Sequence, residues 1–186
     1  PKYSHAITSS VTSFQYLDYI NEQTVLINNL DTKIKKKCIL RLHKEEKNYK
    51  WHTARRIKRA SKSILIDEGN KDIIKLIRDS KICVVTTNGT SYLESLNMNI
   101  PTLIFFNKKF DTLNQNVKKD FMVLKKNKIY FDDPIKLSNH LNKIWDNVET
   151  WWNSKKIQNV VEKFCINYSR KTNKVEQELA SILKRL

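Results

Sequence analysis

Glycine, proline and cysteine are scarce in this chain of 186 residues, which holds two, three and three of them respectively. The two glycines, Gly69 and Gly89, belong to neither GxGxxG nor GxxxxGK(S/T), so classical dinucleotide-binding and P-loop sites are excluded. No apolar run approaches the length that crosses a bilayer, and none has the pattern of a signal peptide. The cysteines, Cys38, Cys83 and Cys165, show no CxxC or other ligand spacing, which predicts buried, reduced thiols.

Acidic residues are also few beside basic ones, because 19 Asp and Glu face 35 Lys and Arg, a net charge of +16. Such a charge attracts polyanions, whether nucleic acid, acidic lipid headgroups or a phosphorylated substrate. The basic residues are spread over every segment, with small clusters at 33–37 and 55–62, and no RNP, zinc-finger or helix-turn-helix signature accompanies them. We therefore attribute the charge mainly to a composition rich in Lys, Asn and Ile, with attraction to an anionic membrane as the alternative. We expect no nucleic-acid partner.

The stretch 81–106, KICVVTTNGTSYLESLNMNIPTLIFF, organises the rest of the chain. It reads as a buried strand at 82–86, a polar turn with Gly89, a short helix at 91–98, a break at Pro101 and a second buried strand at 102–106. An apolar β-branched run, a glycine turn opening a helix and another apolar run are typical of a strand–helix–strand crossover in a parallel sheet.

The flanking segments continue this alternation of strands and helices. Further strands are predicted at 37–43, 63–66 and 129–131, with a turn at 67–69; helices are predicted from Ser13, at 51–60, from Asp72, at 114–126, from Pro134, at 155–168 and from Val175. Residues 1–12 read as a loop and Trp151–Trp152 as a short link, while the apolar stripes of the last two helices should pack against the sheet or a neighbouring domain. The sequence thus predicts one α/β domain over 1–186, a Rossmann-like parallel sheet with flanking helices, ending in helices over 155–186.

Polar side chains gather where the predicted strands end, which is the ligand edge of such a sheet. Arg41 and His43 close the strand at 37–43, and their donors suit a phosphate. The turn Thr87 to Ser91 opens a helix, whose first amides and partial positive charge favour an anion. Within it Gly89 allows close backbone approach or a positive φ, Thr90 and Ser91 offer hydroxyls to a diphosphate, and Glu94 can accept from sugar hydroxyls.

Each of these assignments has a purely structural alternative. Ser91 and Glu94 fit a capping box, in which both side chains satisfy backbone donors and bind no ligand. Arg41 and His43 could line the strand exit in solvent. The pair Asp132–Asp133 looks like a metal site, but the following Pro134 favours an N-cap at Asp133, so no metal is predicted.

The run VVTTNGTSYLESLNMNIPTLIFF at 84–106 resembles the nucleotide-sugar-binding segment of GT-B glycosyltransferases, and RLH at 41–43 resembles a strand end of the related capsule and teichoic-acid transferases. Lys44 stands where that group usually has proline. Together with the tail at 144–168, which begins IWDNVETWW, the resemblance covers most of residues 37–170 and is closest to bacterial surface-polysaccharide transferases. It implies the C-terminal half of a GT-B fold, with Thr90, Ser91 and His43 contacting the donor phosphates and Glu94 the ribose or the sugar. We expect Arg41, Asn88 and Gly89 to take part in holding the donor as well.

The resemblance also implies an activity. We expect metal-independent transfer of a sugar from a nucleotide-sugar donor to a glycan or lipid-linked acceptor, without a further cofactor, in the cytoplasm or peripherally at the inner face of the membrane. The acceptor site and the catalytic base would lie in an N-terminal domain, so the chain, which opens on Pro1, is expected to be a fragment that is inactive alone. The alternatives are a basic module without catalysis, which binds nucleic acid or anionic membrane, and a sugar-nucleotide epimerase of similar topology.

Overall fold

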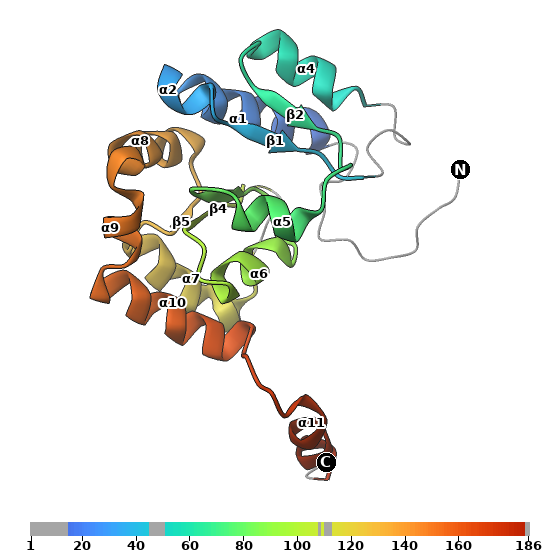
Figure 1. Cartoon of the computed structure of the whole chain (residues 1–186), viewed down its shortest axis with the longest axis vertical. Coiled ribbons are helices and arrows are strands. Elements are labelled where there is room, and N and C mark those ends of the chain that lie inside the picture. The colour runs from blue at the N-terminus through green and yellow to red at the C-terminus, as the bar shows by residue number, and fades with distance from the viewer. Residues whose placement is uncertain (1–14, 45–50, 108, 110–112, 185–186) are drawn as a thin grey trace.

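The structure, a computed structural model, describes residues 15–44, 51–107, 109 and 113–184, and it is an α/β arrangement in which helices flank parallel strands (Figure 1). The prediction of an α/β chain with parallel strands is therefore confirmed. The segment from residue 1 to 12, and Ser13 as a helix cap, lie outside the described residues.

The described strands form two parallel sheets. The first pairs β1 (Ile39–Arg41) with β2 (Leu65–Asp67); the second has the order β3 (Cys83–Val85), β4 (Thr102–Phe105), β5 (Tyr130–Phe131). The register places Arg41 opposite Asp67 at the carboxyl end of the first sheet. All four residues of β4 are buried, as expected for the middle strand of a sheet that is covered on both faces.

Two of the described helices precede β1, and further helices follow each strand and end the chain. They are α1 (Tyr16–Asn28), α2 (Thr32–Lys35), α4 (Thr53–Ala60), α5 (Ile73–Arg78), α6 (Ser91–Asn97), α7 (Gln115–Lys126), α8 (Pro134–Ile144), the 3-10 turn η2 (Trp145–Asn147), α9 (Val148–Trp152), α10 (Lys155–Tyr168) and α11 (Val175–Leu183). Two predicted caps are confirmed: Asp72 accepts from the Lys75 amide at 2.8 Å, and Asp133 accepts from the amides that open α8 behind Pro134.

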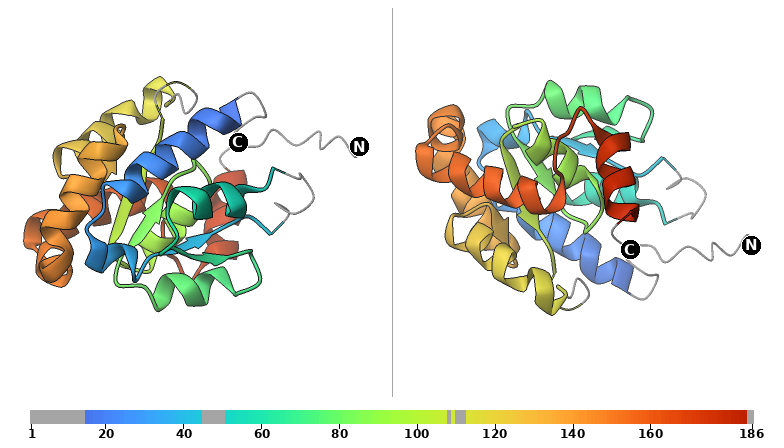
Figure 2. Two further views of the ribbon diagram at one scale, coloured as in Figure 1. Left: turned by 90° about the horizontal axis from the view of Figure 1, so that it is seen from above. Right: turned by 90° about the horizontal axis from the view of Figure 1, so that it is seen from below.

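The alternation of side chains along β4 divides the core into two clusters. Leu103 and Phe105 belong to a cluster with α1, α4 and α8, whereas Ile104 and the following Phe106 belong to one with α6, α7 and α10. Seen from above, α1 and α4 lie in front of the strands, and seen from below α10 does (Figure 2). In a parallel sheet of this kind a ligand usually binds at the loops that follow the carboxyl ends of the strands.

Four details differ from the sequence-based predictions. The strands predicted at 37–43 and 63–66 correspond to the shorter β1 and to β2, which lies further along the chain, because the parallel pairing runs only from Ile39 with Leu65 to Arg41 with Asp67. The prediction of a short link at Trp151–Trp152 is wrong, because both residues belong to the end of helix α9. Trp152 is buried there, and its indole Nε1 donates a hydrogen bond to the carbonyl of Asn99 at 3.1 Å. The stripe of α10 packs as predicted, but α11 buries no residue and projects away from the other elements (Figure 1).

Candidate functional site

The loop between β3 and α6 and the first turn of α6 together carry five of the seven residues predicted to hold a ligand: Asn88, Gly89 and Thr90 in the loop, and Ser91 and Glu94 in the helix. Thr86, the first residue after β3, is fixed by a hydrogen bond of 2.9 Å between its hydroxyl and that of Tyr19 on α1. The amide of Gly89 donates to the Thr87 carbonyl at 2.9 Å, which makes the turn tight. Asn88, Gly89, Ser91 and Glu94 are half-buried and Thr90 is exposed.

Gly89 does not use a left-handed backbone conformation, which the structure instead places at Gly69 with φ +85°. Among the described residues other than its two chain neighbours, a single atom lies within 4 Å of a Cβ added at Gly89, the Thr87 hydroxyl oxygen at 4.0 Å. These residues therefore leave space beside the Gly89 backbone, as close approach by a ligand requires.

The capping box predicted as the alternative for this turn does not form. Thr90 is the N-cap of α6 and makes no side-chain cap hydrogen bond, and Ser91 is already the first helical residue. Within the part of the chain that the structure describes, the side chains of Asn88, Thr90, Ser91 and Glu94 make no hydrogen bond to protein groups. Their donors and acceptors are therefore available to a ligand, together with the amides of the first helical turn.

Arg41 and His43, the two predicted site residues at the end of β1, have different surroundings. Arg41 donates from one guanidinium nitrogen, Nη1, to Asp67 Oδ2 at 2.7 Å and to the Lys71 carbonyl at 2.7 Å. Its side chain is 25 % exposed and that of Asp67 only 5 %. His43, two residues further, is exposed. Arg41 thus fixes the loop between β2 and α5, and His43 is the residue of the pair that reaches the surface.

Close backbone packing reinforces this end of the first sheet. The Leu42 amide donates to the Asp67 carbonyl at 2.8 Å. A Cβ on Gly69 would lie 2.6 Å from the Lys44 Cα, so only glycine fits there, both for space and for its positive φ. In Figure 1 the end of β1 and the start of α5 lie on the same, right-hand side of the molecule.

Two residues that shape the site were not predicted. Asp67 was assigned to a turn, although an acidic residue directly after the apolar run Leu65–Ile66, with an Arg at the end of the preceding strand, was a usable signal. The hydrogen bond between Tyr19 and Thr86 joins residues 67 positions apart, and no local sequence pattern predicts it.

Metal ligands are not grouped in the described part of the chain, where no cluster of three or more His, Cys, Asp and Glu side chains could hold an ion. Asp133 is used as a cap, and Asp132 forms an ion pair with Lys125 at 2.6 Å. The three cysteines are free, and burial raises the pKa of the Cys38 and Cys83 thiols to about 11.

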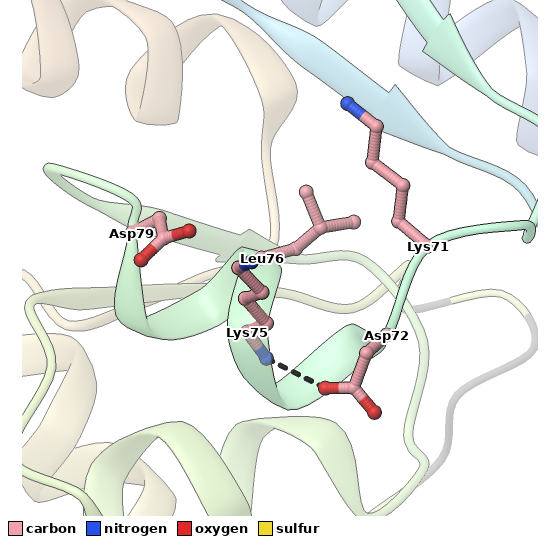
Figure 3. A pocket seen from close by; sticks show the side chains of 5 residues that line it. All are labelled: Lys71, Asp72, Lys75, Leu76 and Asp79. Atoms are coloured by element: carbon pink, nitrogen blue, oxygen red, sulfur yellow. Dashed lines mark hydrogen bonds between the residues drawn. The ribbon is translucent and has the colours of Figure 1, made fainter.

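A pocket of about 430 Å³ lies at α5 and is lined by Lys71, Asp72, Lys75, Leu76 and Asp79 (Figure 3). None of the seven predicted residues lines this pocket. Its lining residue Lys71 is nevertheless linked to the Arg41–Asp67 pair, because the Lys71 carbonyl accepts a hydrogen bond from Arg41.

Among the described residues, no helix is both long and apolar enough to span a bilayer.

Comparison with known proteins gives one family. The model of the family described as "LIC12162 family transferase" matches residues 1–183. No curated protein and no solved structure matches the chain. The family match spans nearly all of the sequence, including every residue of the site described above.

Proposed function

The chain belongs to the LIC12162 family of transferases, and from this we propose that it is a glycosyltransferase that binds a nucleotide-activated sugar donor. The sugar would be transferred to a cell-surface polysaccharide or lipopolysaccharide acceptor. The family match supports group transfer in general. The resemblance of residues 84–106 to the donor segment of GT-B enzymes supports the sugar nucleotide.

One observation carries the proposal furthest: among the described residues, the side chains of Asn88, Thr90, Ser91 and Glu94 have no hydrogen-bond partner in the protein, although all but Thr90 are half-buried. Forming a capping box would have satisfied Ser91 and Glu94 locally, but the helix begins in a way that leaves both available. Half-buried donors and acceptors without partners lose hydration without compensation, which a polar ligand restores. The open space beside Gly89 gives such a ligand room to approach.

The chemistry proposed for the loop is stabilisation of the leaving group. As the bond between the sugar and the diphosphate breaks, negative charge develops on the phosphate oxygens, and donors placed there in advance lower the barrier. Thr90, Ser91 and the first amides of α6 would donate to these oxygens, with His43 as a further phosphate contact. Asn88 and Glu94 would hold the polar groups of the nucleoside or the sugar.

Arg41 receives a different role in this proposal. Because its guanidinium Nη1 is held by Asp67 and the Lys71 carbonyl, we expect it to position the rim beside the donor. The groups named for the leaving diphosphate are amides, hydroxyls and an imidazole, so the proposed transfer is metal-independent. The resemblance assigns acceptor binding and the catalytic base to a domain other than the one described here, so this domain alone would bind the donor without transferring the sugar.

Isothermal titration calorimetry with a panel of nucleoside diphosphates tests the proposal. The double variant Thr90→Val/Ser91→Ala should bind at least ~10-fold more weakly, because each hydrogen bond to a charged group contributes about 1.5–3 kcal/mol. Thr150→Val, an exposed threonine of α9, is the matched control and should leave the affinity unchanged. Absence of binding for every nucleotide, or equal affinities in the variant and the control, would contradict the proposal.

A further inference from the structure

Helix α4 has a strongly basic exposed surface. It buries only Thr53 and Ile57, while its cations, with Lys62 just beyond its end, are exposed. We call these residues the basic face of α4: Arg55, Arg56, Lys58, Arg59 and Lys62. Arg55 and Arg59 lie one turn apart on the side of the helix opposite the buried pair. Arg56 and Lys58 lie on either side of them, so the cations cover a broad face of a helix about 12 Å long, at 1.5 Å per residue.

Within the described part of the chain, no acidic side chain pairs with the basic face of α4. The sequence contains no Asp or Glu from residue 47 to residue 66. Arg56 Nε donates to the Trp51 carbonyl at 3.1 Å and Lys58 Nζ to the Ile64 carbonyl, and carbonyls leave the positive charge uncompensated. Elsewhere in the described chain, Lys33, Arg41, Lys125 and Arg170 each have a carboxylate partner, but no residue of the basic face does.

We infer that the basic face of α4 docks the protein on the surface of an anionic lipid bilayer. Lys and Arg near such a surface are attracted by its negative potential within a Debye length. Apolar and aromatic groups occur on the same two packed helices: Leu17 of α1, which contacts α4, is 56 % exposed, and the half-buried Trp51 precedes α4 with its ring 4.3 Å from that of Tyr16. Cations beside aliphatic and indole groups suit the boundary of headgroups and acyl chains.

A bilayer explains these features better than a nucleic acid does. Nucleic-acid surfaces normally combine phosphate contacts with groups that read base edges or stack on bases, and the sequence around α4 matches no such motif. The inference about the basic face goes beyond the proposed sugar transfer and does not need it. Only one corollary rests on that function: a docked enzyme would meet a lipid-linked acceptor at the surface that carries it.

Co-sedimentation of the full chain with lipid vesicles tests this inference. The chain should bind vesicles of phosphatidylcholine mixed with phosphatidylglycerol, should leave pure phosphatidylcholine vesicles unbound, and should dissociate as sodium chloride is raised. Arg55→Gln/Arg59→Gln should weaken binding about 25-fold, at roughly fivefold for each basic residue removed. The control Lys155→Gln/Lys156→Gln removes the same charge from exposed positions of α10 and should change binding little.

The reasoning is overturned if both double variants weaken binding equally, since net charge alone would then account for it. It is also overturned if Arg55→Gln/Arg59→Gln binds the anionic vesicles as well as the unaltered chain. Binding of an RNA oligonucleotide through Arg55 and Arg59, without binding to the vesicles, would make the basic face a nucleic-acid surface and overturn the inference as well.

Discussion

Replacing Arg41 with methionine leaves the Asp67 carboxylate buried without its counter-charge. Only 5 % of the Asp67 side chain is exposed, and Arg41 donates to it at 2.7 Å. Removing one partner of a buried pair typically costs about 3–5 kcal/mol, because the remaining charge stays desolvated. Since Arg41 is itself 25 % exposed and water can partly replace it, we expect the lower end, about 3 kcal/mol.

Urea unfolding followed by circular dichroism measures this loss. For a chain of this size about 3 kcal/mol also corresponds to a melting temperature lower by ~6–12 °C. Lys33→Met is the matched control, because its ion pair with Asp146 joins side chains that are 51 % and 69 % exposed. Exposed pairs contribute ~1 kcal/mol or less. The second variant Asp67→Asn keeps an acceptor for Arg41 and should lose less stability than Arg41→Met.

Combining the two changes should restore part of the loss. In Arg41→Met/Asp67→Asn no charge is left buried, so the double variant should be more stable than the sum of the single effects by at least ~1 kcal/mol. If Arg41→Met were as stable as Lys33→Met, or if the two changes were additive, the pair would not hold the end of the first sheet. The positioning role proposed for Arg41 would then be wrong.

Three further predictions concern other parts of the chain. Asp133→Ala removes the cap of α8 and should lower the free energy of unfolding by about 1 kcal/mol in urea titrations; an unchanged midpoint would contradict the cap. Burial raises the pKa of the Cys83 thiol to about 11, so iodoacetamide at neutral pH should label it far more slowly in the folded than in the unfolded chain. Burial, with Lys128 and Lys143, lowers the pKa of His140 from its ordinary 6.5 to about 4. The unfolded chain therefore binds more protons in that interval, and stability should fall as the pH drops from 6.5 towards 4; His140→Phe should flatten this dependence.

The central part of the fold was predictable because its information is local. The apolar β-branched run before Gly89 and the break at Pro101 define β3, α6 and β4 within 26 residues, and Asp133 with Pro134 marks the start of α8. The burial of Trp152 in a helix was not predictable, since its indole is held by a hydrogen bond to Asn99, 53 positions earlier in the chain. The unburied stripe of α11 has the same periodicity as the buried stripe of α10, so periodicity alone does not distinguish them.

The candidate site was predictable in its position more than in its details. Polar residues after apolar strands indicated the edge of the sheet, and the β3–α6 loop lies there. Ser91 and Glu94 matched a capping box, yet the helix begins one residue earlier, with Thr90 as N-cap, so the local pattern was misleading. The partner of Arg41 depends on the pairing of β1 with β2, whose contact joins residues 26 positions apart.

The claim that the β3–α6 loop holds a nucleotide is tested most directly by amide chemical shifts. A titration of the isotope-labelled chain with uridine diphosphate and the other nucleoside diphosphates should move the backbone amide signals of Asn88, Gly89 and Thr90 most, with a smaller response at His43. Largest shifts at the pocket of α5 or on α4 would contradict the account, as would the absence of any shift at the loop for every nucleotide.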